Sequence, residues 1–108
     1  MDAVFRAMAD PTRRRILAEV ARENWTVAEI SRPFRISPPA ISRHLRVLED
    51  AGLLRRIRDG KFHRFELQPR LILQAGEMLR YLAREWTARI DRLEAFLDRE
   101  AKAARKER

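Results

Sequence analysis

The chain has 108 residues, a length that fits one domain over residues 1–108, and it carries a net charge of +8 with a pI near 11.3. This charge favours an acidic partner, either nucleic acid or an anionic membrane surface. The absence of cysteine excludes disulfides, thiol catalysis and thiolate metal sites. No apolar run reaches the length of a membrane span and the N-terminus lacks a signal-peptide pattern, so we expect a cytoplasmic protein.

Two helices are expected at the start of the chain. The first nine residues form a short amphipathic pattern whose apolar side carries Val4, Phe5 and Met8. The second helix has clear start signals, because Asp10 can cap it and Pro11 suits its first position. Its apolar stripe consists of Ile16, Leu17, Val20 and Ala21.

A third, short helix is expected to begin after Thr26. The segment TVAEI is a capping box, in which the side chains of Thr26 and Glu29 bond to each other's backbone N–H groups. Pro33 should end or kink this helix, because proline lacks the N–H that a helix interior needs. A tight turn at residues 35–37 is then expected.

The segment SPPAISRHLRVLEDAGL predicts a fourth helix with both ends marked. Ser37 can cap it, Pro38 takes its first position and Gly52 ends it. At about 100° per residue, the apolar residues share one side, which must face the core: Ile41, Leu45 and Leu48. A different side carries short and basic residues: Pro39, Ser42, Arg43 and Arg46.

We expect this polar side to face DNA. A short helix, a tight turn, a second helix and a following hairpin make the plan of a winged helix-turn-helix. Residues 35–64 hold eight Arg or Lys against three Asp or Glu, so +5 of the total +8 lies there. Arginines can reach base edges or phosphates in a major groove, and the free N–H groups of the helix N-terminus can meet a phosphate. The alternative is an ordinary solvated helix face.

The segment LLRRIRDGKFHRFEL predicts a two-stranded hairpin, the wing, with a two-residue turn at Asp59-Gly60. This register creates two like-charge pairs, one of which places Arg55 opposite Arg64, and such pairs destabilise a hairpin. DNA phosphate would relieve the repulsion; the alternative is that the arginines splay into water. The wing residues predicted to contact DNA are Arg56, Arg58, Lys61, His63 and Arg64.

A long helix is expected over residues 71–100, followed by a charged tail at 101–108. Its apolar stripe steps by three or four through Leu71, Ala75, Met78, Leu82, Trp86, Ile90, Leu93 and Leu97. So broad a stripe can face its own domain and a second copy together, so we expect dimer contacts at Leu82, Trp86, Ile90, Leu93 and Leu97. The alternative is a helix that packs wholly on its own domain. The fold class is then mainly α, a winged helix-turn-helix with a two-stranded β-wing and a long C-terminal dimerisation helix.

Catalytic and metal-binding patterns do not emerge from the sequence. There is no Ser-His-Asp arrangement, no phosphate-cradling glycine loop and no carboxylate pair in an expected pocket. Two histidines, His44 and His63, without cysteines or a carboxylate cluster make a weak case for zinc. We therefore expect neither an enzyme nor a protein with a metal or cofactor.

Three segments together resemble the ArsR family of winged-helix bacterial repressors: MADPTRRRIL, TVAEISRPFRISPPAISRHLRVLEDAGLL and RDGKFHRFEL. The resemblance covers roughly residues 5–97. It implies a homodimer built from the first and last helices, with Val4, Phe5 and Met8 on the first helix at the interface, bound to an operator with dyad symmetry. It also implies that the wing touches flanking DNA and that the recognition surface includes Ser37, Pro38, Pro39, Ser42, Arg43 and Arg46.

The chain departs from the family's metal-sensing members. Those carry cysteines in the helix before the turn, where this chain reads TVAEISRPF, or Asp and His ligands in the last helix, where this chain has no histidine. The resemblance therefore implies a cysteine-free, autorepressor-like regulator whose inducer is undefined.

Two other functions remain open on sequence grounds. A winged-helix module could bind another protein, and its charged face would then serve only solubility. Such a module would expose an apolar patch beyond the dimer surface. An RNA-binding protein would offer aromatic side chains for base stacking, and only Phe62 and His63 lie near the wing.

Overall fold

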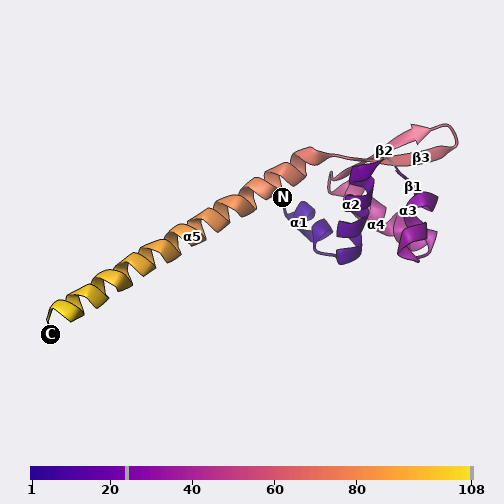
Figure 1. The fold of residues 1–108 in the computed structure, drawn as a ribbon. Coiled ribbons are helices and arrows are strands. Elements are labelled where there is room, and N and C mark those ends of the chain that lie inside the picture. Colours follow the sequence, from indigo (N-terminus) through magenta and orange to yellow (C-terminus); the bar gives the residue numbers. More distant parts are fainter. Residues whose placement is uncertain (24, 108) are drawn as a thin grey trace. The chain divides into compact units, whose positions relative to one another are not determined.

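The computed structural model describes residues 1–23 and 25–107. In order along the chain, the elements are α1 (Asp2–Met8), α2 (Pro11–Arg22), β1 (Trp25–Thr26), α3 (Val27–Phe34), α4 (Pro38–Asp50), β2 (Leu54–Asp59), β3 (Phe62–Leu67) and α5 (Pro69–Lys106) (Figure 1). The chain divides into two units, the winged unit (Met1–Ala75) and the C-terminal segment from Gly76 onward. The predicted fold class is confirmed.

The predicted helix starts are confirmed at α2 and α3. The Asp10 carboxylate accepts a hydrogen bond from the Arg13 backbone N–H at 2.9 Å, and this bond holds the pKa of Asp10 below its usual value. Thr26 and Glu29 form both bonds of the capping box. The hydrogen bond from the Thr26 hydroxyl likewise lowers the pKa of Glu29. Both helix starts are thus stabilised by contacts three residues apart.

The turn between α3 and α4 begins one residue later than Pro33 indicates. Pro33 lies within the last turn of α3, and the helix continues to Phe34, whose side chain is buried. Arg35 then adopts a left-handed conformation, with φ at 53°, and reverses the chain. A proline in the last turn costs the helix few hydrogen bonds, because the helix does not continue far beyond it.

Helix α4 has the predicted ends. The Ser37 hydroxyl accepts a hydrogen bond from the Ala40 N–H at 3.4 Å, and prolines occupy the first helical positions. At the other end, Gly52 takes φ of 80°. The N–H groups of Gly52 and Leu53 then bond back to Glu49 and Leu48, which satisfies the last carbonyls of the helix. A side chain at Gly52 would also meet Leu71 Cδ1, 3.0 Å from the position of an added Cβ.

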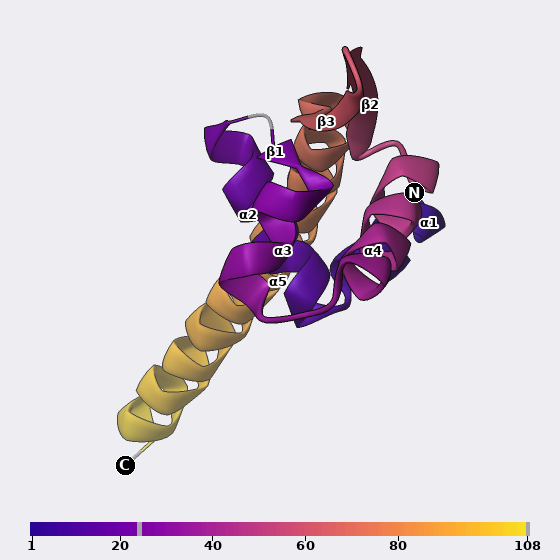
Figure 2. The ribbon, with the colours of Figure 1, turned by 90° about the vertical axis from the view of Figure 1, so that its right-hand side faces the viewer.

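The sheet contains a strand that the sequence did not predict. The two residues of β1 pair with β3, so the antiparallel order is β1-β3-β2 (Figure 2). Trp25 lies opposite Phe65. Two residues are too few to show the alternation by which a strand is recognised in sequence. The wing itself is the β2–β3 hairpin.

The predicted register of this hairpin is wrong. Asp59 lies opposite Phe62, so Gly60 and Lys61 form the loop, and Arg55 lies opposite Glu66 instead of Arg64. Gly60 has φ of 60°, which suits the first loop position of a tight hairpin. The observed register pairs opposite charges across the strands, and such pairs favour it over the predicted one.

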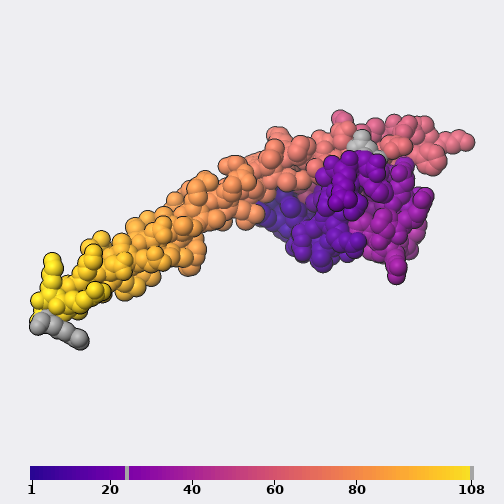
Figure 3. All heavy atoms as spheres, viewed as in Figure 1, coloured from indigo at the N-terminus to yellow at the C-terminus, as the bar shows by residue number. Residues whose placement is uncertain are grey.

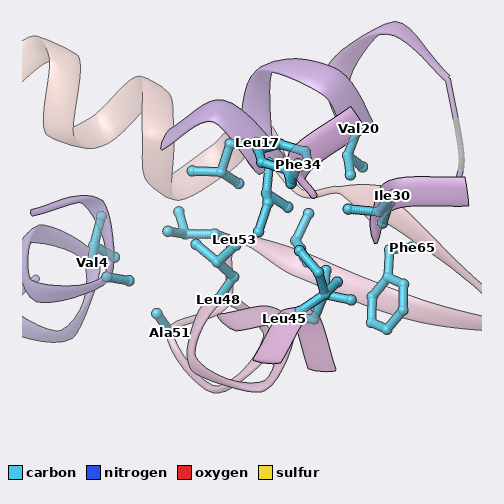
Figure 4. Close-up of a cluster of buried hydrophobic side chains, with 14 of the residues drawn as sticks. Val4, Leu17, Val20, Ile30, Phe34, Leu45, Leu48, Ala51, Leu53 and Phe65 are labelled. Atoms are coloured by element: carbon cyan, nitrogen blue, oxygen red, sulfur yellow. The ribbon is translucent and has the colours of Figure 1, made fainter. Parts of the chain in front are cut away.

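An apolar cluster holds the winged unit together. Side chains from α2, α3, α4 and the sheet converge on it (Figure 4). Its largest fully buried members are Phe65, Ile16, Ile30, Ile41, Leu45, Leu48 and Leu53. The predicted inward side of α4 is therefore confirmed. Helix α4 and the wing therefore pack against the same core.

Helix α5 is longer than predicted at both ends. It begins at Pro69, and it continues through Gly76 and the expected charged tail to Lys106; the last tail residue, Arg108, lies outside the described residues. Ala75 is buried in the winged unit. The residues that follow it form a rod of side chains one helix thick, coloured orange to yellow in Figure 3. None of the described helices is long and apolar enough to span a membrane.

Candidate nucleic-acid interface

Helix α4 presents its predicted polar side to solvent. Ile41, Leu45 and Leu48 are fully buried, and this burial fixes the rotation of the helix about its axis. The residues predicted on the recognition surface are consequently exposed: Ser37, Pro38, Pro39, Ser42, Arg43 and Arg46. Short side chains at the helix start allow close approach of a large partner, and the two arginines supply charge and hydrogen-bond donors one turn further along.

A cleft of about 340 Å³ joins α4 to the wing. We call it the arginine cleft. It is lined by Ser42, Arg43, Leu45 and Arg46 from α4, Arg56 and Phe65 from the wing, and Val27 from α3. Three guanidinium groups around one hollow make a site for an anion, because each can donate two parallel hydrogen bonds to a phosphate or carboxylate.

Arg56 is held in place on the wall of the arginine cleft. Its guanidinium lies 5.1 Å from the centre of the Phe65 ring, and its Nη2 atom lies 3.4 Å from Oε1 of Glu49. The Phe65 ring is fully buried. Glu49 and Phe65 therefore position Arg56, with its side chain still 42% exposed to a partner.

The sequence did not identify Glu49 or Phe65 as positioning residues. In the predicted register Phe65 lay opposite Leu54, whereas it lies opposite Arg56. The correct register could have been recognised by its charges, because it places Arg55 opposite Glu66, and those side chains form an ion pair of 3.0 Å. Residues seven apart on different elements, such as Glu49 and Arg56, give no local signal.

The structure overturns the repulsion argument for the wing. Arg64 lies opposite Ile57, and its Nε atom lies 2.8 Å from Oδ2 of Asp59. Arg58, Lys61 and His63 are exposed toward the end of the hairpin. Among the described residues, neither Arg58 nor Lys61 forms an ion pair, so their charges are available to a partner without any repulsion inside the hairpin.

The residues predicted at a dimer interface fall into two groups. On α1, Val4 is only 2% exposed, and Phe5 and Met8 pack against the core of the same chain. Val4 thus has little surface left for a partner. On the C-terminal segment the predicted residues are exposed by 39% to 62%: Leu82, Trp86, Ile90, Leu93 and Leu97.

The two histidines lie apart from each other. His44 lies close enough to Asp10 to contribute to the lowered pKa of that carboxyl, and His63 is exposed on the wing. Within residues 1–23 and 25–107, no group of three or more His, Asp or Glu side chains comes together as metal ligands would. The expectation of no metal stays a prediction.

Comparison with known proteins gives matches along most of the chain. A family model described as a helix-turn-helix domain matches residues 8–57. The transcriptional repressor SdpR of Bacillus subtilis is 40% identical over 67 residues, which make up 62% of this chain and 74% of SdpR. YuzN, an uncharacterized HTH-type transcriptional regulator of the same organism, is 37% identical over 92 residues, covering 79% of this chain and 92% of YuzN.

A solved structure of an ArsR-like transcriptional regulator from Rhodococcus sp. RHA1 has the same fold. It superposes with a TM-score of 0.75 at 25% identity, and the match covers 88% of this chain and 90% of that one.

Proposed function

This chain belongs to the ArsR family of winged-helix, DNA-binding transcriptional regulators, and we propose that it acts as a homodimer that represses transcription from an inverted-repeat operator. The members of this family are regulators, so the chain is not an enzyme. The observation that carries the proposal is the arginine cleft, which joins the exposed side of α4 to the wing.

In this proposal α4 lies in the major groove of DNA. Ser42 and Arg43 face the bases, while the short residues Ser37, Pro38 and Pro39 allow the helix start to approach the phosphate backbone. Arg46 completes the α4 side of the arginine cleft. Arginine donates two hydrogen bonds to the edge of guanine, so Arg43 supplies sequence selection.

The wing supplies phosphate contacts on either side of that groove. Arg56 borders the arginine cleft, and from there the basic surface continues along the hairpin through Arg58, Lys61, His63 and Arg64. Contacts to phosphate fix the position of the protein on the duplex without reading its sequence. They also make the affinity fall steeply with salt, because each contact releases counterions.

A homodimer explains the exposed apolar side chains of the C-terminal segment. Monomeric proteins rarely expose contiguous apolar patches of this extent. Two-fold symmetry would place two copies of α4 about one turn of DNA apart, or a multiple of it, so the operator would be an inverted repeat. A dimer bound over a promoter excludes the polymerase, which makes repression the expected outcome, as the name of SdpR also indicates for that relative.

The proposed regulator does not sense metals through thiolates. The chain has no cysteine, and the residues after Leu67 include no histidine. We expect its control to come from another signal or from its own concentration.

Selection of DNA fragments from a random pool, followed by sequencing, tests the proposal. The expected product is an inverted repeat that the protein binds tightly and in a salt-dependent manner, with no change on addition of zinc or arsenite. Selection of unrelated fragments with equal affinity would contradict it. Preferential binding of single-stranded RNA, or capture of a protein in the absence of DNA binding, would support one of the two other functions.

A further inference from the structure

One of the three arginines of the arginine cleft is held by an acidic residue. Arg56 donates a hydrogen bond from Nη2 to Oε1 of Glu49 over 3.4 Å, and its guanidinium lies 5.1 Å from the centre of the buried Phe65 ring. In the part of the chain that the structure describes, Arg43 and Arg46 form no ion pair. The wing arginine is thus restrained by a carboxylate, and the two α4 arginines are not.

Glu49 lies in an electrostatically unfavourable position. It occupies the last turn of α4, and the carbonyl end of a helix disfavours a negative charge. It also lies close to the surface proposed to approach DNA, where a carboxylate repels phosphate. The contact with Arg56 is the interaction in the structure that offsets these two effects.

We propose that the arginine cleft seats one phosphate of the DNA backbone between Arg46 of α4 and Arg56 of the wing, and that Glu49 positions Arg56 for this contact. The inference rests on the DNA-binding function proposed above. It adds the place of one contact and a role for an acidic side chain at a basic interface. Glu49 acts only through Arg56 and contacts no DNA itself.

The cleft keeps its capacity for an anion although Arg56 is held. A guanidinium has five N–H donors, and Glu49 accepts a hydrogen bond from one of them. Among the described residues, no carboxylate lines the cleft, so its charge stays positive. Its volume of about 340 Å³ is roughly ten times the 30 Å³ that one water molecule occupies in the liquid, which leaves room for a phosphate group.

Restraint of Arg56 favours phosphate binding for an entropic reason. A surface arginine samples many rotamers, and binding removes this freedom. Glu49 and the Phe65 ring remove part of it before DNA is bound. Because Arg46 and Arg56 belong to different elements, a phosphate between them would attach α4 and the wing to the same point of the duplex. This contact would therefore fix the angle of α4 in the groove.

Substitution of Glu49 distinguishes positioning from simple charge repulsion. Removal of a carboxylate near the interface should by itself strengthen DNA binding by about twofold. If Glu49 positions Arg56, Glu49→Ala should instead weaken binding to the DNA selected from the random pool by about fivefold. Glu49→Gln removes the same charge but keeps an oxygen that can accept from Arg56, so its affinity should lie between those of wild type and Glu49→Ala. Stronger binding by both variants would overturn the inference.

Asp50→Ala is the control for charge. It removes one negative charge from the neighbouring position of α4, and Asp50 forms no ion pair within the described part of the chain. We expect this variant to bind the same DNA about twofold more tightly than wild type. A loss as large as that of Glu49→Ala would show that the end of α4 tolerates no substitution, and would contradict a role specific to Glu49.

Glu66→Ala is the control for the loss of an ion pair on the wing. Glu66 pairs with Arg55 at 3.0 Å, and Arg55 does not line the arginine cleft. Arg55 and Arg56 are consecutive on β2, so their side chains point to opposite faces of the hairpin. Glu66→Ala should not weaken binding. A fivefold loss here would mean that any broken ion pair on the wing has the same effect.

A double-mutant cycle tests whether Glu49 acts through Arg56. Arg56→Ala should weaken binding by about 10-fold through the loss of a charge-assisted contact. In this background Glu49→Ala has no arginine to release, so it should strengthen binding, as Asp50→Ala does. The same loss in both backgrounds would mean that Glu49 acts on the fold instead. Urea unfolding of Glu49→Ala checks this directly, and its midpoint should stay close to that of wild type because partly exposed ion pairs contribute little.

Neutral backbone substitutions locate the phosphate itself. DNA duplexes are prepared that each carry one methylphosphonate, which lacks the charge of a phosphate. One position in each half-site should weaken binding of wild type but cause no further loss for Arg56→Ala. If every position weakens the two proteins equally, the cleft holds no phosphate and the inference is wrong, while the proposed function stands. A wild-type chain that selects no DNA contradicts both.

Discussion

The winged unit and the C-terminal segment use apolar residues in opposite ways. In the winged unit, seven large apolar side chains are fully buried within one chain, and α4 and the wing are fixed by them. In the C-terminal segment, Leu82, Trp86 and Leu93 are each more than half exposed, although their helical spacing is as regular as that of Ile41, Leu45 and Leu48. The same pattern therefore specifies a core in one region and an exposed apolar surface in the other. The difference lies in what the rest of the chain packs against each helix.

Replacing a leucine by glutamate in each region should give the largest effects and test this comparison directly. The first site is Leu48. Leu48→Glu removes a fully buried side chain and places a charge in the core. We expect a loss of at least about 4 kcal/mol in the free energy of unfolding, enough to unfold most of the winged unit. Urea denaturation followed by circular dichroism measures it. A variant that unfolds at the wild-type urea concentration would show that the cluster is not the source of stability.

Leu93→Glu should instead leave the winged unit folded. Leu93 is 56% exposed within the chain, so the charge meets no core there, but at a homodimer interface it would be buried twice. The dissociation constant of the dimer should rise by more than about 100-fold, and operator affinity should fall while weak non-specific DNA binding persists. Sedimentation and DNA titration measure the two effects. Ala95→Glu, on the outer side of α5, is the control. A normal dimer on a palindrome would contradict the assignment of this interface.

Within the winged unit, Arg43→Ala should distinguish sequence-specific recognition of the operator from non-specific attraction to DNA. The exposed position of Arg43 beside Ser42 at the arginine cleft suits a base contact. Its loss should reduce operator binding relative to random DNA by about 1–3 kcal/mol. The control Arg22→Ala, at the end of α2, should change neither the affinity for the operator nor the affinity for random DNA. If operator and random DNA are weakened equally, Arg43 contacts phosphate only.

A smaller effect is expected on the wing. Arg58→Ala should weaken binding to all sequences and reduce the slope of log affinity against log salt by about one, as the loss of one phosphate contact requires. Arg55→Ala provides the comparison, because the Arg55 guanidinium is already paired with Glu66 at 3.0 Å. Salt titrations of both variants measure the slopes. An unchanged slope for Arg58→Ala would show that Arg58 does not contact DNA phosphate.

The smallest effect concerns pH and the cap of α2. The Arg13 N–H lowers the pKa of Asp10 in the folded chain below its ordinary value of 3.8. Stability from this carboxylate is therefore present above that value and is lost as the pH falls through the lower, folded pKa. Asp10→Asn keeps a capping oxygen but cannot titrate, so its urea midpoint should fall less than that of wild type at pH below about 4. Identical acid profiles would show that the cap does not contribute to acid unfolding.

Much of the fold could be predicted because its signals are local. The caps at Asp10, Thr26 and Ser37 act over three residues, and each was found where the sequence placed it. The inward side of α4 followed from spacing alone. The exposure of the α4 arginines could be predicted as well, because a helix that buries one side in the core exposes its opposite side to solvent.

What the sequence by itself determined are the helices, their caps and the two apolar faces, since each depends on neighbours within one or two turns. Only the tertiary structure decided the hairpin register, the pairing of Trp25 with Phe65, and the contacts of Arg56 with Glu49 and Phe65. These depend on residues brought together from separate elements. A shift of the register by two residues keeps every side chain on its side of the sheet, so the alternation of apolar and polar residues cannot detect it. The charges and side chains that face each other across the strands determine which of the two registers forms.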